Sequence, residues 1–253
     1  MRIVVLLIVA LLLPTQEKKK PAAAETPKPL FALPLTVPAG FKGKVTIRGQ
    51  KLDDVTEVST TESKAKLKLT GKPRKSAGPK DFPADKAGDS ECDLDLELPK
   101  DFPVGSLPIT LVGPKGKSET FLLAIDDSPT TAEKEPNDGF NQAQELTLPT
   151  VVVAKIERDK DVDVFRFVGK AGEKVRIEVF AARLGSPTDT LLTVYDAEKR
   201  VLTSVDDTDG KPDPIVNLTL PRDGVYYISV IESNDLGGAI FAYRLHLTRH
   251  TTK

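Results

Sequence analysis

A short acidic segment contains the residues of this sequence best suited to bind a metal ion. Of the six residues from Glu133 to Asp138, four carry side-chain oxygens: Glu133, Glu135, Asn137 and Asp138. Pro136 restricts the backbone between them. Calcium takes about six to eight hard oxygen ligands in loose geometry, so carboxylates and amides alternating along an extended segment suit it. The chemistry this segment predicts is the binding of a hard divalent cation.

A second acidic group precedes a later run of β-type residues. Asp159, Asp161 and Asp163 alternate with other residues, and a period of two places Asp161 and Asp163 on one face of a strand. If the first segment packs beside the start of this strand, the oxygens of both groups converge on one site. The alternative is an acidic linker beside an ordinary solvated strand edge. Spacing alone leaves both interpretations open.

The sequence offers few residues for catalysis. Its only histidines, His246 and His250, lie near the C-terminal end, whereas nucleophilic catalysis needs a histidine held firmly against the nucleophile. Two such histidines and one cysteine cannot build a closed zinc site. A carboxylate-based hydrolase is a remaining alternative, although there is no Trp and there are only four Tyr to line a sugar cleft. We expect a protein that is not an enzyme.

Cys92 is the only cysteine, so the chain cannot form an internal disulfide. Its neighbours Glu91 and Asp93 would raise the pKa of the thiol and make it a poor nucleophile. We therefore expect a buried, unreactive cysteine within a strand.

The N-terminus is typical of an exported protein. A basic start is followed by an apolar run from Ile3 to Leu13, which is too short to span a bilayer but matches a secretory signal. We expect a signal peptide at 1–15 and a linker rich in Lys, Pro and Ala at 16–29. An uncleaved membrane anchor is the alternative. Secretion or a periplasmic or cell-envelope location is predicted, with no membrane span in the mature form.

The remaining sequence predicts an all-β protein with two domains. Short alternating runs separated by Gly and Pro favour an Ig-like β-sandwich over residues 30–126, a linker at 127–134 and a second β-sandwich at 135–249. Residues 72–90 lack periodicity and are expected to form a long surface loop. Asp206–Gly210 contains part of an EF-hand pattern but lacks its full spacing, so a hairpin turn is expected. Tyr226 is a candidate tyrosine-corner residue.

Residues 132–249 resemble the bacterial pre-peptidase C-terminal domain. The resemblance rests on Glu135-Pro136-Asn137-Asp138, then Asp161-x-Asp163-x-Phe165-x-Phe167, and later Asp223-Gly224-x-Tyr226-Tyr227 and Tyr243-x-Leu245. It implies a jelly-roll-like sandwich appended to exported proteins. In related collagen-binding modules, an E-x-E-x-N-D segment and a nearby aspartate pair bind calcium, which implies Ca²⁺ as the ion. The matching positions here are Glu133, Glu135, Asn137, Asp138, Asp161 and Asp163. Because the aromatic residues that grip collagen are scarce here, collagen is not implied as the ligand.

Residues 30–126 more weakly resemble an IPT/TIG-type Ig-like domain. This resemblance rests on turn residues such as Val37-Pro38-x-Gly40 and Leu98-Pro99-x-Asp101-x-Pro103-x-Gly105. It supports the fold more than any activity.

These features predict a non-catalytic, exported binding or accessory protein of the bacterial envelope, stabilised by calcium. Its expected partner is an extracellular polymer, a surface or a protein ligand. A structural or accessory subunit of an envelope assembly, or of a secreted peptidase, is the main alternative. The net charge of −1 gives no overall attraction to nucleic acid, which is not expected as a partner.

Overall fold

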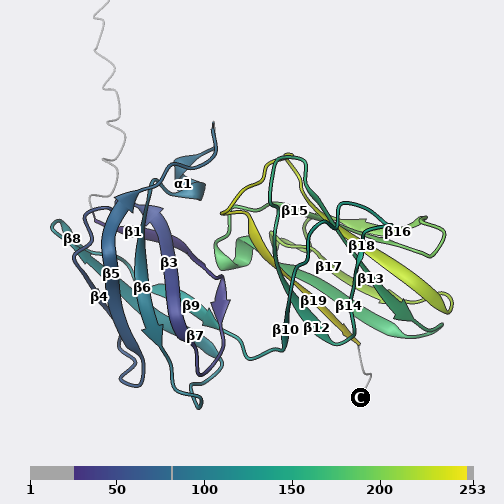
Figure 1. The fold of residues 1–253 in the computed structure, drawn as a ribbon, viewed down its shortest axis with the longest axis horizontal. Helices are drawn as coiled ribbons and strands as arrows, with labels where there is room; N and C mark the ends of the chain where they lie inside the picture. The colour runs from purple at the N-terminus through teal and green to yellow at the C-terminus, as the bar shows by residue number, and fades with distance from the viewer. Residues whose placement is uncertain (1–25, 81, 250–253) are drawn as a thin grey trace, which may run out of the picture.

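The computed structural model describes residues 26–80 and 82–249, and the regular structure in them is almost entirely β-strand. Two β-sandwiches lie beside each other along the long axis of the molecule (Figure 1). This confirms the predicted all-β, two-sandwich fold. Among the described residues, no helix has the length and apolar character needed to cross a membrane. The predicted signal peptide at 1–15, and the predicted linker as far as residue 25, lie outside the described residues.

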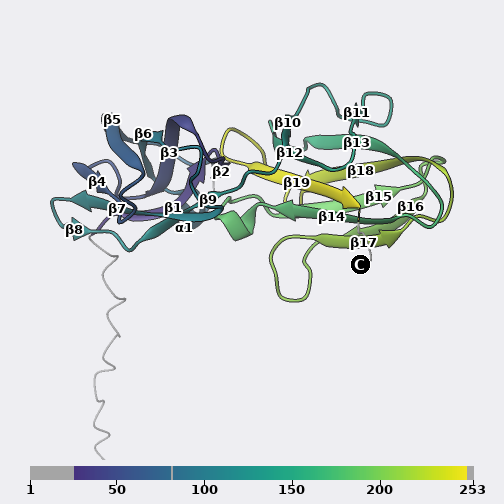
Figure 2. The same cartoon turned by 90° about the horizontal axis from the view of Figure 1, so that it is seen from below.

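The first sandwich packs two sheets face to face, as Figure 2 shows. One sheet has the strand order β1–β3–β6–β5, and the other has the order β2–β9–β7–β4 with β8 paired to β7. The strands of the first sheet are β1 (Lys28–Leu33), β3 (Lys42–Gln50), β6 (Ser90–Glu97) and β5 (Lys66–Lys75). Those of the second are β2 (Thr36–Val37), β9 (Phe121–Ile125), β7 (Gly105–Gly113), β4 (Glu57–Ser59) and β8 (Gly116–Lys117).

Alternation along β6 shows how the sequence forms this sheet. Cys92, Leu94 and Leu96 are buried in the core, while the acidic residues between them face outward. Burial raises the pKa of the Cys92 thiol to about 12, and the neighbouring carboxylates of Asp93 and Glu91 add to the shift. The prediction of a buried, unreactive cysteine is therefore confirmed.

Two expected connections contain more structure than predicted. Lys28 and Pro29, the last residues of the expected linker, already belong to β1. In the expected loop 72–90, β5 continues to Lys75, β6 begins at Ser90 and α1 (Ala84–Ala87) lies between them. The buried guanidinium of Arg48 donates hydrogen bonds to the carbonyl oxygens of Ser76, Ala77 and Ala87, at 2.8, 3.2 and 2.9 Å. Between the ends of these strands, a side chain and not a strand ladder satisfies several of the carbonyl oxygens, which explains the missing periodicity there.

The second sandwich contains two five-stranded sheets. The first has the order β10 (Thr130–Ala132), β12 (Thr150–Lys155), β19 (Ala242–Arg249), β14 (Lys174–Phe180) and β17 (Ile215–Thr219). The second has the order β11 (Gln144–Glu145), β13 (Val162–Gly169), β18 (Gly224–Glu232), β15 (Thr190–Tyr195) and β16 (Val201–Val205). Strand β10 lies within the expected linker 127–134, and β11 was not predicted.

Two turn predictions in the second sandwich are confirmed. The hydroxyl of buried Tyr226 donates a hydrogen bond of 2.7 Å to the carbonyl oxygen of Arg222, as a tyrosine corner requires. Between β16 and β17, Asp209 and Gly210 form a tight turn in which both have positive φ, and Thr208 and Lys211 pair across it. The acidic run 206–210 is therefore a hairpin turn.

The two sandwiches share apolar contacts. Phe31 of β1 and Ala87 of α1 are fully buried in the hydrophobic cluster of the second sandwich. The rings of Phe82 and Phe241 meet edge to face, with centroids 5.6 Å apart. Arg244 of β19, which is almost fully buried, forms an ion pair of 2.6 Å with Asp126 at the end of the first sandwich. The second sandwich is therefore packed against the first and not only connected to it by the linker.

Candidate metal centre

The acidic segment 133–138 crosses from one sheet of the second sandwich to the other. At one end, β10 pairs in parallel with β12, and the Glu133 amide donates a hydrogen bond of 3.1 Å to the Val153 carbonyl oxygen. At the other end, the Val164 amide of β13 donates a hydrogen bond of 2.9 Å to the Asn137 carbonyl oxygen. The backbone thus fixes the segment directly against the start of β13, where Asp163 lies.

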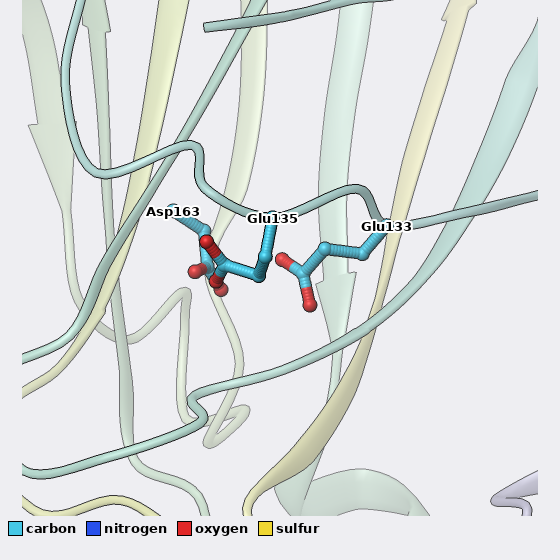
Figure 3. Close-up of side chains that lie close together, drawn as sticks. All are labelled: Glu133, Glu135 and Asp163. Atoms are coloured by element: carbon cyan, nitrogen blue, oxygen red, sulfur yellow. The ribbon is translucent and has the colours of Figure 1, made fainter. Parts of the chain in front are cut away.

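This crossing brings the two acidic groups together, as one of the two sequence interpretations expected. Carboxylate oxygens of Glu133, Glu135 and Asp163 lie within 4.8 Å of one another. Figure 3 shows these three carboxylates close together where the segment passes β13. Asn137 is fully buried beside them, and its side-chain nitrogen donates a hydrogen bond of 3.3 Å to Glu133. Four of the six predicted residues therefore form one group.

The remaining two predicted residues interact with a positive charge instead. The guanidinium of Arg158 forms an ion pair with Asp138 and lies 3.2 Å from Oδ1 of Asp161. The other oxygen of Asp161 accepts a hydrogen bond of 2.6 Å from the Glu157 amide. Asp161 directly precedes β13, and its side chain is fully buried. Asp161 therefore contacts the loop before the strand while its charge still contributes to the raised pKa of Asp163.

Three buried oxygens at the site have no hydrogen-bond partner among the described residues. They are Oδ1 of Asn137, Oδ1 of Asp163 and Oδ1 of Asp161, although the last of these lies in an ion pair with Arg158. A buried acceptor without a partner is costly, so such atoms cluster where an ion or water completes the site. All three are hard oxygen atoms, the ligand type that calcium prefers. The donor set therefore fits a calcium ion.

The raised pKa values of the carboxylates also favour a bound cation. Burial, together with the charge of Glu133, raises the pKa of Asp163 to about 9. Burial is also the main cause that raises the pKa values of Glu133, Glu135 and Asp161. Glu135 is exposed, but Asp163 is fully buried and Glu133 partly so, and the charged forms of these crowded carboxylates are favoured by a nearby positive charge.

One neighbour of the site was not assigned a role from the sequence. The hydroxyl of Tyr243 in β19 donates a hydrogen bond of 2.6 Å to Oδ2 of Asp163, and the tyrosine is fully buried. This bond fixes the carboxylate and leaves its other oxygen directed into the group. The motif Tyr243-x-Leu245 was a recognisable signal, but only the fold brings it to Asp163.

The raised pKa of Asp163 predicts a pH dependence in the metal-free protein. The pKa in the folded state lies far above that of a free aspartate, so this group's stabilising contribution is complete below about pH 4 and is lost as the pH rises towards 9. With a chelator present, we expect the second sandwich to melt at a lower temperature at pH 8.5 than at pH 5.5. The measurement is thermal unfolding by circular dichroism. Asp163→Asn serves as the control and should flatten this dependence, whereas an equal slope in both proteins would contradict the assignment.

A second group of carboxylates, Asp189, Asp206 and Asp207, also lies close together. All three side chains are exposed to solvent. This group therefore lacks the burial that distinguishes the site around Asp163.

Comparison with known proteins identifies the second sandwich. Residues 161–232 match the family described as the bacterial pre-peptidase C-terminal domain. Over 116 residues, the chain is 33% identical to a probable subtilase-type serine protease of Deinococcus radiodurans. That match covers 45% of this chain and only 16% of the protease.

Comparison with solved structures finds two small proteins that align to about half of the chain. One is the pre-peptidase C-terminal domain of a Bacillus anthracis collagenase, with 14% identity and a TM-score of 0.36 over 46% of this chain and all of that domain. Another is PliG of Aeromonas hydrophila, a periplasmic inhibitor of g-type lysozyme, with 14% identity and a TM-score of 0.33 over 48% of this chain and 96% of its own. The sequence match, together with the strand pattern around it, shows that the second sandwich is a bacterial pre-peptidase C-terminal domain.

Proposed function

We propose that this chain is a non-catalytic, exported accessory or binding protein whose second sandwich is held together by a calcium ion. The observation that carries the calcium proposal is the pair of buried, unpartnered oxygens on Asn137 and Asp163, beside the carboxylates of Glu133 and Glu135. Glu133 and Glu135 would complete the ligand set, and Asp138 is available once Arg158 moves aside. The ion would supply the positive charge that the crowded carboxylates need.

The position of the site indicates what the ion would do. Glu133 follows β10 directly, and the Lys155 amide of β12 donates a hydrogen bond of 3.0 Å to its carboxylate. Asp163 lies on β13, in the opposite sheet. An ion bound by both residues would tie one sheet to the other at the point where the chain enters the second sandwich. Its role is therefore structural.

A non-catalytic role is supported by the surroundings of the ionisable groups. Asp163 is fully buried and Asp161 nearly so, which removes these two carboxylates from direct contact with a substrate. His246, the only histidine within residues 26–80 and 82–249, packs against Phe180 with ring centroids 4.5 Å apart. Burial lowers its pKa to about 4. A neutral, packed imidazole of this kind is suited to the structure and not to proton transfer at neutral pH.

Export and an accessory role are supported by the apolar N-terminal run and by the domain family. A probable subtilase-type serine protease of Deinococcus radiodurans is 33% identical to this chain over 116 residues, which supports an association with secreted peptidases. An accessory subunit of a secreted peptidase or of an envelope assembly is the main alternative to a free binding protein. Co-purification of the chain with a partner from the periplasmic or culture fraction would distinguish the two.

Calcium is expected to stabilise the second sandwich of a protein comprising residues 26–253. With the dissociation constants of extracellular calcium modules, a few millimolar calcium should add on the order of 1–2 kcal/mol, or several degrees in Tm. Differential scanning calorimetry with calcium, with magnesium and with chelator measures the effect. Magnesium controls for ionic strength and should give a smaller shift, because it demands tighter octahedral geometry. Identical melting curves in calcium and chelator would contradict the proposal.

A further inference from the structure

The outward face of one sheet in the first sandwich has an ordered pattern of charge. In β6 the outward residues are acidic, and they lie between outward basic residues of β3 and β5. Glu97 is paired with Lys42 on one side and Lys66 on the other. Asp95 is likewise paired with Lys44 and Lys68. Each of these two rows has two positive charges and one negative charge.

The excess of positive charge continues along the edge strand. From Lys64 to Lys75 the chain carries six basic and no acidic side chains. Strand β5 forms the edge of its sheet, so these side chains have no further strand beside them. The first domain as a whole has no net charge over residues 30–128, with fifteen basic and fifteen acidic residues. The edge strand therefore carries a local excess of positive charge that the overall composition does not, although Lys64 is paired with Asp101, and Arg74 with Glu91 and Asp93.

A groove follows the same rows of side chains. It has a volume of about 410 Å³ and is lined by Lys42, Lys66 and Lys68 together with Asp95, Glu97 and the strand backbone. Figure 2 shows β3, β6 and β5 forming one layer of the first sandwich, on the side away from β7 and β9. All residues that line the groove belong to the first sandwich.

The ion pairs of Glu97 are exposed and leave Lys42 and Lys66 available, whereas Lys44 and Arg74 are held by the largely buried Asp93. Lys66 and Lys42 lie 3.3 and 3.6 Å from Glu97, and their side chains are 78% and 77% exposed. Exposed pairs of this kind contribute little to stability, so a lysine can exchange Glu97 for a ligand anion at small cost. Lys68 forms no ion pair within the part of the chain that the structure describes.

We propose that the β3–β6–β5 face of the first sandwich, centred on Lys42, Lys66 and Lys68, binds an acidic polysaccharide. Strand rows repeat about every 7 Å, so the lysine pairs form a short ladder of positive charge that a linear polymer with regularly spaced anionic groups can follow. Glu97 and Asp95 lie within the ladder and can accept hydrogen bonds from sugar hydroxyls. A nucleic acid fits less well, because β3, β5 and β6 contain no aromatic side chain on which a base could stack.

The test measures binding of the full chain to two acidic glycans. Polygalacturonate presents carboxylates alone, and heparin presents both sulfates and carboxylates. The variants are the double substitution Lys66→Gln/Lys68→Gln and the control Lys170→Gln/Lys174→Gln, which removes two exposed lysines from the second sandwich. We expect the first double variant to weaken binding at least roughly tenfold. We also expect the slope of log K against log salt concentration to become shallower by roughly 1–2, because binding then releases fewer counterions. The control should bind as wild type does.

Three outcomes would overturn the proposal. These are equal binding by both double variants, no binding of either glycan at low salt, or tighter binding of single-stranded DNA than of both glycans. Preference for one glycan would identify carboxylate or sulfate as the recognised group. Chelator should leave the binding unchanged, because the face lies on the first sandwich. A failed calcium experiment and a failed glycan experiment can therefore be told apart. Thermal unfolding of each variant checks that loss of binding does not arise from loss of folding.

Discussion

Replacing Asp163 by asparagine is expected to stabilise the second sandwich in chelator and to abolish its stabilisation by calcium. In the metal-free protein, a buried carboxylate with a pKa of about 9 is crowded by Glu133 and Asp161. Asparagine has the same shape without the charge, and it can still accept the hydrogen bond from Tyr243. At pH 8 the folded protein must keep this group largely protonated, whereas the unfolded chain ionises it, and this difference costs stability. Asparagine is neutral in both states, so the substitution should add on the order of 1–3 kcal/mol at pH 8. The same change removes a charged calcium ligand. The variant should therefore be more stable than the wild type in chelator and gain less stability from calcium.

Thermal unfolding at pH 8 in chelator and in a few millimolar calcium measures both effects. Asp189→Asn is the matched control, because it removes a carboxylate from the exposed acidic group of the same sandwich. The control should retain the full calcium response. If Asp163→Asn still gained stability from calcium while Asp189→Asn did not, the exposed group would be the calcium site. If Asp163→Asn lost stability in chelator, the carboxylate would have a structural role that its electrostatics do not explain.

Replacing Phe31 by alanine is expected to separate the unfolding of the two sandwiches. Phe31 lies on β1 of the first sandwich, but its fully buried ring belongs to the hydrophobic cluster of the second. Loss of a fully buried phenylalanine costs about 3–5 kcal/mol. Because this ring contributes to the contact between the sandwiches, its removal weakens their coupling as well as their stability. Calorimetry should show one transition for the wild type and two for the variant.

Phe167→Ala provides the control for this experiment. Phe167 is equally buried and lies within the second sandwich, where its ring stacks on Tyr226 with centroids 5.5 Å apart. Its loss should lower the melting temperature by a similar amount without affecting the contact between the sandwiches. Two transitions in the wild type would show that the interface does not couple the domains. A single transition in the Phe31 variant would show that the coupling does not depend on Phe31.

Local sequence patterns determined most of the strands and turns. Cys92, Leu94 and Leu96 alternate with acidic residues, and this alternation by itself requires a strand with one buried face. The Asp209–Gly210 turn and the tyrosine corner at Tyr226 depend on residues only a few positions apart. Such features could be predicted because the interactions that form them are local. Segment 72–90 could not be predicted, because the guanidinium that holds it, Arg48, lies far away in the sequence.

The sequence by itself determined which residues could bind a cation, and the tertiary structure decided which of them meet. Glu133 and Asp163 are thirty residues apart and lie in opposite sheets, so only the packing of those sheets brings their carboxylates together. The same packing places Tyr243 against Asp163 and leaves Asp138 and Asp161 beside Arg158. Residue type sets the chemistry that a side chain can perform. Burial and neighbouring charge exist only after folding, and they decide whether a carboxylate needs a cation.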